Sequence, residues 1–151
     1  MLEVKIVSKS AKETQKIAKI LADKLVRHPV PNNKATVIAL DGNLGSGKTT
    51  FTQGFARALG IKEKVLSPTY VLMKVYRLKK VKRFKLLIHI DCYRLENAKA
   101  LLHLGFKSFL KDKSAVVLVE WANSVKKLLP KETVWIKFRH GKKLHERVMH
   151  I

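Results

Sequence analysis

The pattern of apolar and polar positions predicts a strand and then a long helix at the start of the chain. Residues 2–7 alternate between apolar and polar side chains, which is typical of a strand with one buried face. Ser10 and Glu13 have the spacing of a capping box, so we expect a helix from there to about Val26. The apolar residues expected on its buried face are Ile17, Ile20, Leu21 and Leu25.

A buried strand, a glycine-rich turn and a second helix are predicted next. Residues 28–33 contain two prolines and predict a loop. Residues 36–40 are continuously apolar, as in a parallel strand that is covered on both faces. After the glycine-rich residues 42–47, residues 50–59 predict a helix that Gly60 can end.

The remainder of the chain completes a mixed sheet. Strands are expected over residues 70–78 and 83–90, joined by a lysine-rich turn, and over residues 115–119. A helix is expected over residues 96–104, ending at Gly105, and a closing hairpin over residues 133–151. We therefore expect an α/β fold with helices on both faces of one sheet, parallel in its centre and antiparallel at its margins.

The glycine-rich turn carries the strongest chemical signal. Residues 42–49 match G-x-x-x-x-G-K-[S/T] at every fixed position, between a buried strand and a helix, which disfavours a chance match. Such a turn points backbone N–H groups at phosphate oxygens, and the helix adds its dipole. Lys48 supplies a charge for the β- and γ-phosphates, and the Thr49 hydroxyl can bind Mg²⁺. The sequence therefore predicts a P-loop NTPase-like domain that binds ATP and Mg²⁺ through Asn43, Leu44, Gly45, Ser46, Gly47, Lys48, Thr49 and Thr50.

Two acidic residues are candidates for the metal and for the attacking water. Glu120 follows the apolar residues 115–119, so it lies at the carboxyl end of a buried strand, where the P-loop must also lie. We expect it to act on Mg²⁺ together with Thr49; the alternative is a solvated glutamate. Strand periodicity puts Asp91 on one face with His89, as a candidate for hydrolysis or for a structural ion pair with Arg94. Asp41 is interpreted as a turn residue.

Composition limits the class of protein. The chain has 151 residues, of which 46% are apolar, and this predicts one domain over residues 1–151. The single cysteine, Cys92, excludes an internal disulfide and is expected to face the core. The apolar runs are too short to cross a membrane, and the first residues do not have the pattern of a secretory signal. We expect a cytoplasmic protein that does not contact membranes.

The charge is strongly positive. The chain contains 32 Lys and Arg against 11 Asp and Glu, a formal net charge of +21. Six of the cations fall within residues 77–85. Such a cluster favours polyanions such as tRNA, but a lysine-rich solvated surface explains it equally well, and the sequence leaves both open.

Four motifs together resemble the TsaE family (formerly YjeE), the small bacterial ATPases of tRNA threonylcarbamoyladenosine biosynthesis. The first is the P-loop with Thr50 and Phe51; the others are S-P-T-Y at residues 67–70, H-I-D-C-Y-R-L at residues 89–95, and Glu120-Trp121. The pair Glu13-Thr14 also resembles the N-terminal segment of the family. The P-loop alone is generic, but the order and spacing of the other motifs are specific.

The resemblance implies a slow Mg-dependent ATPase that works with TsaD- and TsaB-type proteins. These partners transfer threonylcarbamoyl to the adenosine beside the anticodon. By resemblance, Lys48, Asp91 and Glu120 form the catalytic set, with Glu120 also on the metal side. Thr69 would belong to a segment that senses the nucleotide, Trp121 would lie near the nucleotide, and Thr14 near its base or ribose.

One residue departs from the family pattern, and two other functions stay open. Asn43 stands where the family usually has Asp, which removes a negative charge beside the phosphates. A P-loop kinase for a small metabolite is one alternative, although no arginine-rich lid is evident. The other is a basic nucleic-acid-binding module in which the nucleotide is only a structural ligand.

Overall fold

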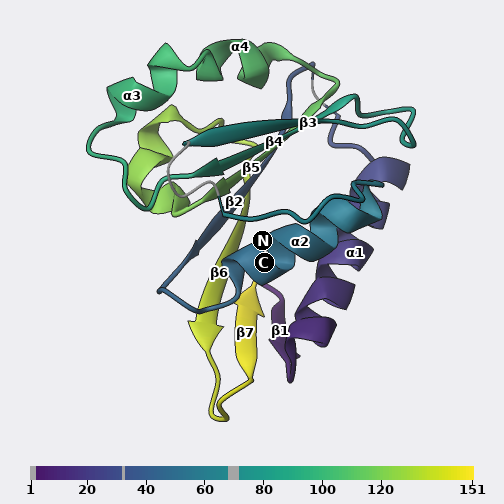
Figure 1. Ribbon diagram of the computed structural model, residues 1–151, viewed down its shortest axis with the longest axis vertical. Coiled ribbons are helices and arrows are strands. Elements are labelled where there is room, and N and C mark those ends of the chain that lie inside the picture. The colour runs from purple at the N-terminus through teal and green to yellow at the C-terminus, as the bar shows by residue number, and fades with distance from the viewer. Residues whose placement is uncertain (1–2, 32, 68–71) are drawn as a thin grey trace.

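The computed structural model describes residues 3–31, 33–67 and 72–151, and its strands and helices form one α/β unit (Figure 1). In chain order they are β1 (Lys5–Ser8), α1 (Ala11–Arg27), β2 (Thr36–Gly42), α2 (Lys48–Ala58), β3 (Met73–Arg77), β4 (Leu86–Asp91), α3 (Ala98–His103), α4 (Phe106–Lys111), β5 (Ala115–Glu120), the 3₁₀ helix η1 (Ala122–Leu128), β6 (Val134–His140) and β7 (Arg147–His150).

The seven strands form one sheet in the order β1-β7-β6-β2-β5-β4-β3. The pairs β2–β6, β2–β5 and β4–β5 are parallel, whereas β3–β4, β6–β7 and β1–β7 are antiparallel. The parallel centre brings the carboxyl ends of β2, β4 and β5 to one edge of the sheet. The expected fold class, with a parallel centre and antiparallel margins, is confirmed.

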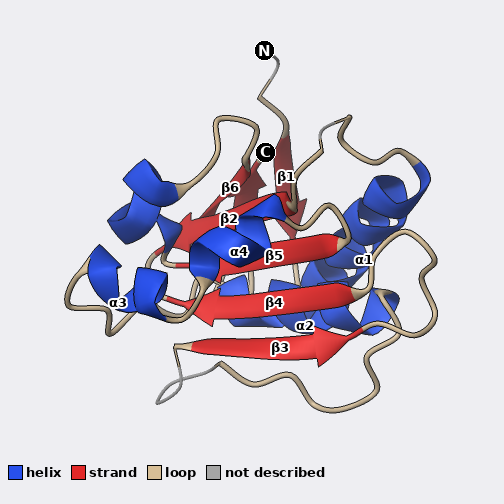
Figure 2. Cartoon of the chain, turned by 90° about the horizontal axis from the view of Figure 1, so that it is seen from above, coloured by secondary structure: helices blue, strands red, loops and turns tan. Residues whose placement is uncertain are grey.

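Two apolar layers cover the sheet, one on each face (Figures 1 and 2). On one face, α1 and α2 pack over residues such as Ile38 and Leu40 of β2. On the other face, α3, α4 and η1 pack over Val37 and Ala39 of the same strand. Because both faces of β2 are covered, its residues 37–40 are apolar without alternation.

Most predicted elements are present, with shifts of a few residues. Two expectations are wrong: that Ile20 lies on the buried face of the first helix, and that Asp41 is a turn residue. Ser10 caps α1, since its side chain accepts a hydrogen bond from the Glu13 N–H at 3.1 Å. However, Ile20 is 68% exposed, because the small residues Ala18 and Ala22 form the face packed against α2. Asp41 lies within β2, paired with Lys137 of β6, and is not a turn residue.

The segment between β4 and β5 also differs from the prediction. The expected helix over residues 96–104 is the shorter α3, and Gly105, with φ 80°, leads directly into a second short helix, α4. The hairpin of β6 and β7 and the antiparallel pair β3–β4 are confirmed. Tyr70, with which the third predicted strand begins, lies outside the described residues.

Candidate nucleotide-binding site

The P-loop of residues 42–49 connects the carboxyl end of β2 to the amino end of α2. Gly47 has φ 105°, a left-handed conformation that side chains other than glycine rarely adopt, and it is the residue that caps α2. A Cβ atom at Gly42 would lie 2.5 Å from the carbonyl oxygen of Phe138 on the neighbouring strand β6. The turn into α2 therefore requires glycine at position 47, and the close approach of β6 requires it at position 42.

Lys48 folds back onto its own loop. Its Nζ donates hydrogen bonds to the carbonyl oxygens of Gly42 at 2.6 Å and Asn43 at 2.9 Å. The ammonium also lies 4.1 Å from the centroid of the Trp121 ring. Burial lowers the pKa of Lys48, and the negative charge of Glu120, followed by that of Asp41 and Asp91, opposes this effect. A phosphate oxygen could replace these carbonyl groups as the partner of the ammonium.

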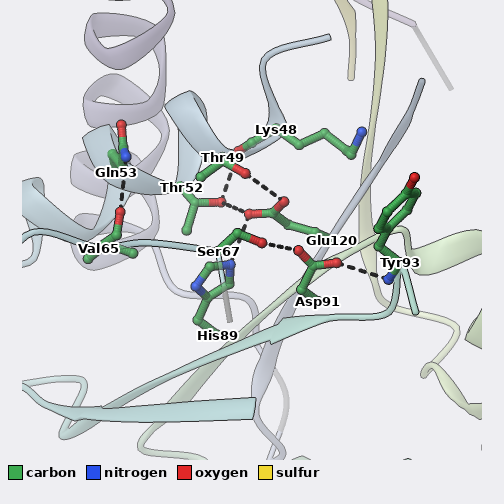
Figure 3. Close-up of polar contacts among 10 residues, drawn as sticks. All are labelled: Lys48, Thr49, Thr52, Gln53, Val65, Ser67, His89, Asp91, Tyr93 and Glu120. Atoms are coloured by element: carbon green, nitrogen blue, oxygen red, sulfur yellow. Dashed lines mark hydrogen bonds and ion pairs between the residues drawn. The ribbon is translucent and has the colours of Figure 1, made fainter. Parts of the chain in front are cut away.

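Glu120 is the centre of a buried hydrogen-bond network at the end of β5 (Figure 3). One carboxylate oxygen accepts from the Thr49 hydroxyl at 3.0 Å. The other oxygen accepts from the Thr52 hydroxyl at 3.1 Å and pairs with Nε2 of His89 at 2.9 Å. With only 1% of its surface exposed, Glu120 is not the solvated glutamate of the alternative interpretation. It links β4, β5 and the first turn of α2.

Asp91 lies beside Glu120, since the two residues are paired at the ends of β4 and β5. One of its carboxylate oxygens accepts from the backbone N–H of Tyr93 at 2.9 Å. The other accepts from the hydroxyl of Ser67, which precedes the segment 68–71 (Figure 3). The proposed role of Thr69 falls on that segment and lies outside the described residues. Asp91 is therefore held at the same edge as the P-loop, as its position in the sequence predicts.

A cavity of about 690 Å³ opens over these residues. It is lined by ten of the predicted site residues: Thr14, Leu44, Gly45, Gly47, Lys48, Thr49, Thr50, Asp91, Glu120 and Trp121. Asn43 and Ser46 are not part of the lining, although Ser46 Oγ lies 3.4 Å from the Lys48 ammonium. Thr14 is 1% exposed, and its hydroxyl is paired with that of Ser8 at 2.6 Å.

Trp121 is held in an unusual backbone conformation. Its φ of 56° is the only positive value among non-glycine residues in the described parts of the chain. Such a conformation costs about 1–3 kcal/mol and persists where surrounding structure enforces it, often at functional sites. Here it places the ring against Lys48 and, with centroids 4.8 Å apart, against Tyr93. Trp121 therefore lies at the lysine side of the cavity.

The structure adds residues that the sequence analysis did not select. His140 of β6 contacts the carbonyl oxygen of Leu44 through Nε2 at 3.2 Å, and Arg147 of β7 donates from Nε to the carbonyl oxygen of Gly45 at 3.1 Å. The C-terminal hairpin thus braces the P-loop. This contact spans about a hundred residues of sequence, and no local pattern indicates it. His89, by contrast, shares a face with Asp91 in the predicted strand, so its role beside Glu120 was open to prediction.

The donor set fits a magnesium ion better than a transition metal. The described residues contain no group of three or more His, Cys, Asp and Glu side chains arranged to hold a metal ion. Thr49 and Glu120 instead offer a hydroxyl and a carboxylate, the hard oxygen donors that Mg²⁺ prefers. Mg²⁺ also keeps several waters and is completed by substrate phosphates, so two protein ligands suffice.

Cys92 is not part of this chemistry. It is buried in the apolar layer beneath α3 and η1, so the expectation that it faces the core is confirmed. Burial, followed by the negative charge of Asp91, raises the pKa of its thiol to about 12. The thiol therefore stays protonated.

No helix in the described parts of the chain is long and apolar enough to span a membrane.

Comparisons with known proteins agree on one family. Residues 8–149 match the family model described as threonylcarbamoyl adenosine biosynthesis protein TsaE. The chain is 37% identical over 136 residues to the TsaE protein of Bacillus subtilis, covering 90% of this chain and 77% of that protein. It is 32% identical to the TsaE protein of Treponema pallidum, covering 90% and 91% of the two chains.

A solved structure supports the same assignment. Bacillus subtilis YdiB superposes with a TM-score of 0.74 at 30% identity, and the match covers 99% of this chain and 84% of that one. The fold of this chain therefore has a solved counterpart that matches it over nearly its whole length. The chain belongs to the TsaE family of tRNA threonylcarbamoyladenosine biosynthesis proteins.

Proposed function

We propose that this chain binds Mg·ATP in the cavity over the P-loop and hydrolyses it in support of threonylcarbamoyl transfer to tRNA. One observation carries the proposal: Lys48, Thr49 and Glu120 converge at the mouth of a loop whose bend requires glycine. The Thr49 hydroxyl already donates to Glu120, so the two expected metal ligands lie within one hydrogen bond of each other. A glycine-rich turn without this acid would explain phosphate binding alone.

The triphosphate would be held by the loop and by the start of α2. Backbone N–H groups of residues 43–49 and the helix N-terminus favour anions. Lys48 would exchange its bonds to the carbonyl oxygens of Gly42 and Asn43 for bonds to the β- and γ-phosphates, and it would offset charge there during hydrolysis. Trp121 limits where the ammonium can go, because its ring covers one side of it.

Thr49 and Glu120 would hold Mg²⁺ when the nucleotide is bound. The ion would neutralise charge on the phosphate oxygens. Thr52 and His89 fix the Glu120 carboxylate in place, so its orientation does not depend on the ligand. A preorganised carboxylate loses no rotational freedom when the substrate arrives.

Asp91 is the group best placed to act on the attacking water. It lies one strand away from Glu120 and lines the cavity, yet it is 8% exposed and held by Tyr93 and Ser67. A carboxylate in this position can accept a hydrogen bond from a water molecule and orient it toward the γ-phosphate. Ser67 connects this carboxylate to the segment 68–71.

The family assignment extends the proposal to partners and location. We propose that the chain works in the cytoplasm with TsaD- and TsaB-type proteins, and that hydrolysis is slow without them. The family itself gives the general role, which is in tRNA threonylcarbamoyladenosine biosynthesis. Partner-stimulated phosphate release, in preference to transfer of phosphate to a metabolite, separates this function from that of a small-molecule kinase.

The test is phosphate release by the purified chain, with and without the partner proteins and with Mg²⁺ or EDTA. We expect Mg-dependent turnover that Asp91→Asn lowers by about 10²-fold or more, with ATP affinity nearly unchanged. Glu132→Gln serves as the matched control, because Glu132 is an exposed carboxylate outside the cavity, and this variant should retain turnover. Turnover that persists in EDTA, or is unchanged in Asp91→Asn, would show that the proposal is wrong.

A further inference from the structure

The strongest charge cluster of the chain lies on one turn. The turn between β3 and β4 carries six cations within residues 77–85 and no acidic residue. We call this turn, with the neighbouring residues Lys111 and Lys113, the basic pole. The six cations of the turn are Arg77, Lys79, Lys80, Lys82, Arg83 and Lys85, and all are exposed.

The basic pole is a fixed surface of the fold. Leu78 and Phe84 on the turn are 8% and 1% exposed, so the turn is anchored in the core while its cations face solvent. The backbone N–H of Lys85 donates to the carbonyl oxygen of Ser114 at 2.8 Å, which brings the start of β5 and the adjacent Lys113 to the turn, with Lys111 at the end of α4 just before them in the chain. The cations are therefore held together by two separate segments of the chain.

Among the described residues, these charges meet little compensating negative charge, since only Asp112 interacts electrostatically with one of them, Lys85. The ion pairs found among the described residues involve none of the cations of the basic pole. Asp112 is the one acid within residues 107–113, and its carboxylate accepts from the N–H and hydroxyl of Ser114. Mutual repulsion of clustered like charges destabilises a folded protein, and a bound polyanion would relieve it.

The basic pole is too far from the nucleotide site to serve ATP. Figure 2 shows the β3–β4 turn and the start of β5 at the end of the sheet opposite α3, whereas the P-loop edge lies at the carboxyl ends of the strands. Strand β4 has six residues, so about 20 Å of extended chain separates Lys85 from Asp91. Charges are screened over about 8 Å at physiological ionic strength. ATP bound at the P-loop would therefore not neutralise this surface.

We propose that the basic pole binds the phosphate backbone of RNA, at a site distinct from the nucleotide cavity. Lysine dominates, and the exposed large apolar residues of the described chain include none within residues 77–85 or 107–113. Lysine contacts phosphates as a point charge without reading bases, and a surface without exposed apolar anchors does not suit membrane insertion. Membership of a tRNA-modifying family makes RNA the relevant polyanion. This inference does not depend on ATP hydrolysis.

The test measures RNA binding of the full chain against salt concentration. Fluorescence anisotropy with a labelled, unmodified tRNA transcript is recorded for the wild type and two charge-matched variants. In the first, Lys79, Lys80, Lys82, Arg83 and Lys85 are replaced by Gln. In the control, five exposed cations at the opposite margin of the sheet are replaced by Gln: Lys5, Lys137, Arg139, Lys142 and Lys143.

Each neutralised phosphate contact lowers the slope of log K against log salt by about 0.7–0.9. We expect the slope of the basic-pole variant to fall by about 2 or more and its affinity by at least about tenfold at 0.1 M salt. The control variant should stay within about threefold of the wild type. Lys48→Ala should bind RNA like the wild type, so failure of the ATPase proposal would not affect this result.

Three outcomes would overturn the inference. Equal losses in both variants would mean that RNA responds only to net charge. No loss in the basic-pole variant would place the contact elsewhere. Binding of phosphatidylserine vesicles, lost in the basic-pole variant while RNA binding is retained, would identify a lipid surface as the ligand.

Discussion

Two substitutions of Glu120 should separate its structural role from its electrostatic role. In Glu120→Gln, the amide oxygen can keep the bonds to Thr52 and His89, and the new NH₂ group can donate to the Thr49 hydroxyl. The network survives and only the charge is lost. In Glu120→Ala, all three bonds are lost together.

The cost of the Ala variant follows from what it leaves behind. Nδ1 of His89 is already buried without a hydrogen-bond partner among the described residues, so losing Glu120 leaves the whole ring unpaired. An unsatisfied buried polar group costs about 1–3 kcal/mol. Thr52 keeps its bond to the carbonyl oxygen of Lys48 at 2.9 Å and adds little. We expect Glu120→Ala to lower the free energy of unfolding by about 3 kcal/mol and Glu120→Gln by about 1 kcal/mol or less.

Urea unfolding followed by far-UV circular dichroism measures these changes, and Tm should fall by about 6–12 °C for the Ala variant. Mg-dependent ATP turnover should be lost in both variants, by about 10²-fold or more in Glu120→Gln. Equal destabilisation of the two variants would refute the hydrogen-bond network. Wild-type turnover in a stable Glu120→Gln protein would refute the metal-side role.

Three further predictions concern the loop and the buried thiol. Arg147→Ala removes the hydrogen bond to the carbonyl oxygen of Gly45, which is worth about 1 kcal/mol. Calorimetry should therefore find ATP binding about fivefold weaker. Unchanged affinity would mean that the hairpin does not brace the loop. Gly42→Ala should abolish ATP binding, since its Cβ would lie 2.5 Å from the carbonyl oxygen of Phe138; tight binding would contradict the requirement for glycine at this bend of the loop. Cys92 has its pKa raised to about 12 in the folded state, so the unfolded chain loses this proton first and stability should decrease as pH rises above about 9. A native Cys92 that reacts rapidly with Ellman's reagent at pH 8 would contradict its burial.

Local patterns predicted the parallel centre of the sheet and the P-loop well. Residues 37–40 and 115–119 are apolar throughout because both faces of these strands are covered, and such runs are visible without a structure. The positions of Asp91 and Glu120 follow from the same logic, since each ends a parallel strand. The register that pairs these two residues confirms that both lie at the edge where the loop lies.

The features that were missed depend on tertiary packing. Ile20 is apolar and has the spacing of the buried face of a helix. However, the buried face of α1 is narrow and includes Ala18 and Ala22, so Ile20 lies outside it and is exposed to solvent. Helix α4 follows α3 after two residues, Leu104 and Gly105, too short a spacing for periodicity to resolve. The contacts of His140 and Arg147 with the loop depend on how the C-terminal hairpin pairs with β2, which no local pattern encodes.

The measurement that tests the central claim most directly is isothermal calorimetry of Mg·ATP binding to the wild type, Lys48→Ala and Lys62→Ala. Lys62 is an exposed lysine outside the cavity and controls for the loss of one positive charge. A charge-assisted contact with phosphate is worth about 2–3 kcal/mol, so Lys48→Ala should bind about 30–150-fold more weakly, with an unchanged far-UV spectrum. Lys62→Ala should bind like the wild type. Equal affinity of Lys48→Ala and the wild type would contradict the claim that residues 42–49 hold the triphosphate.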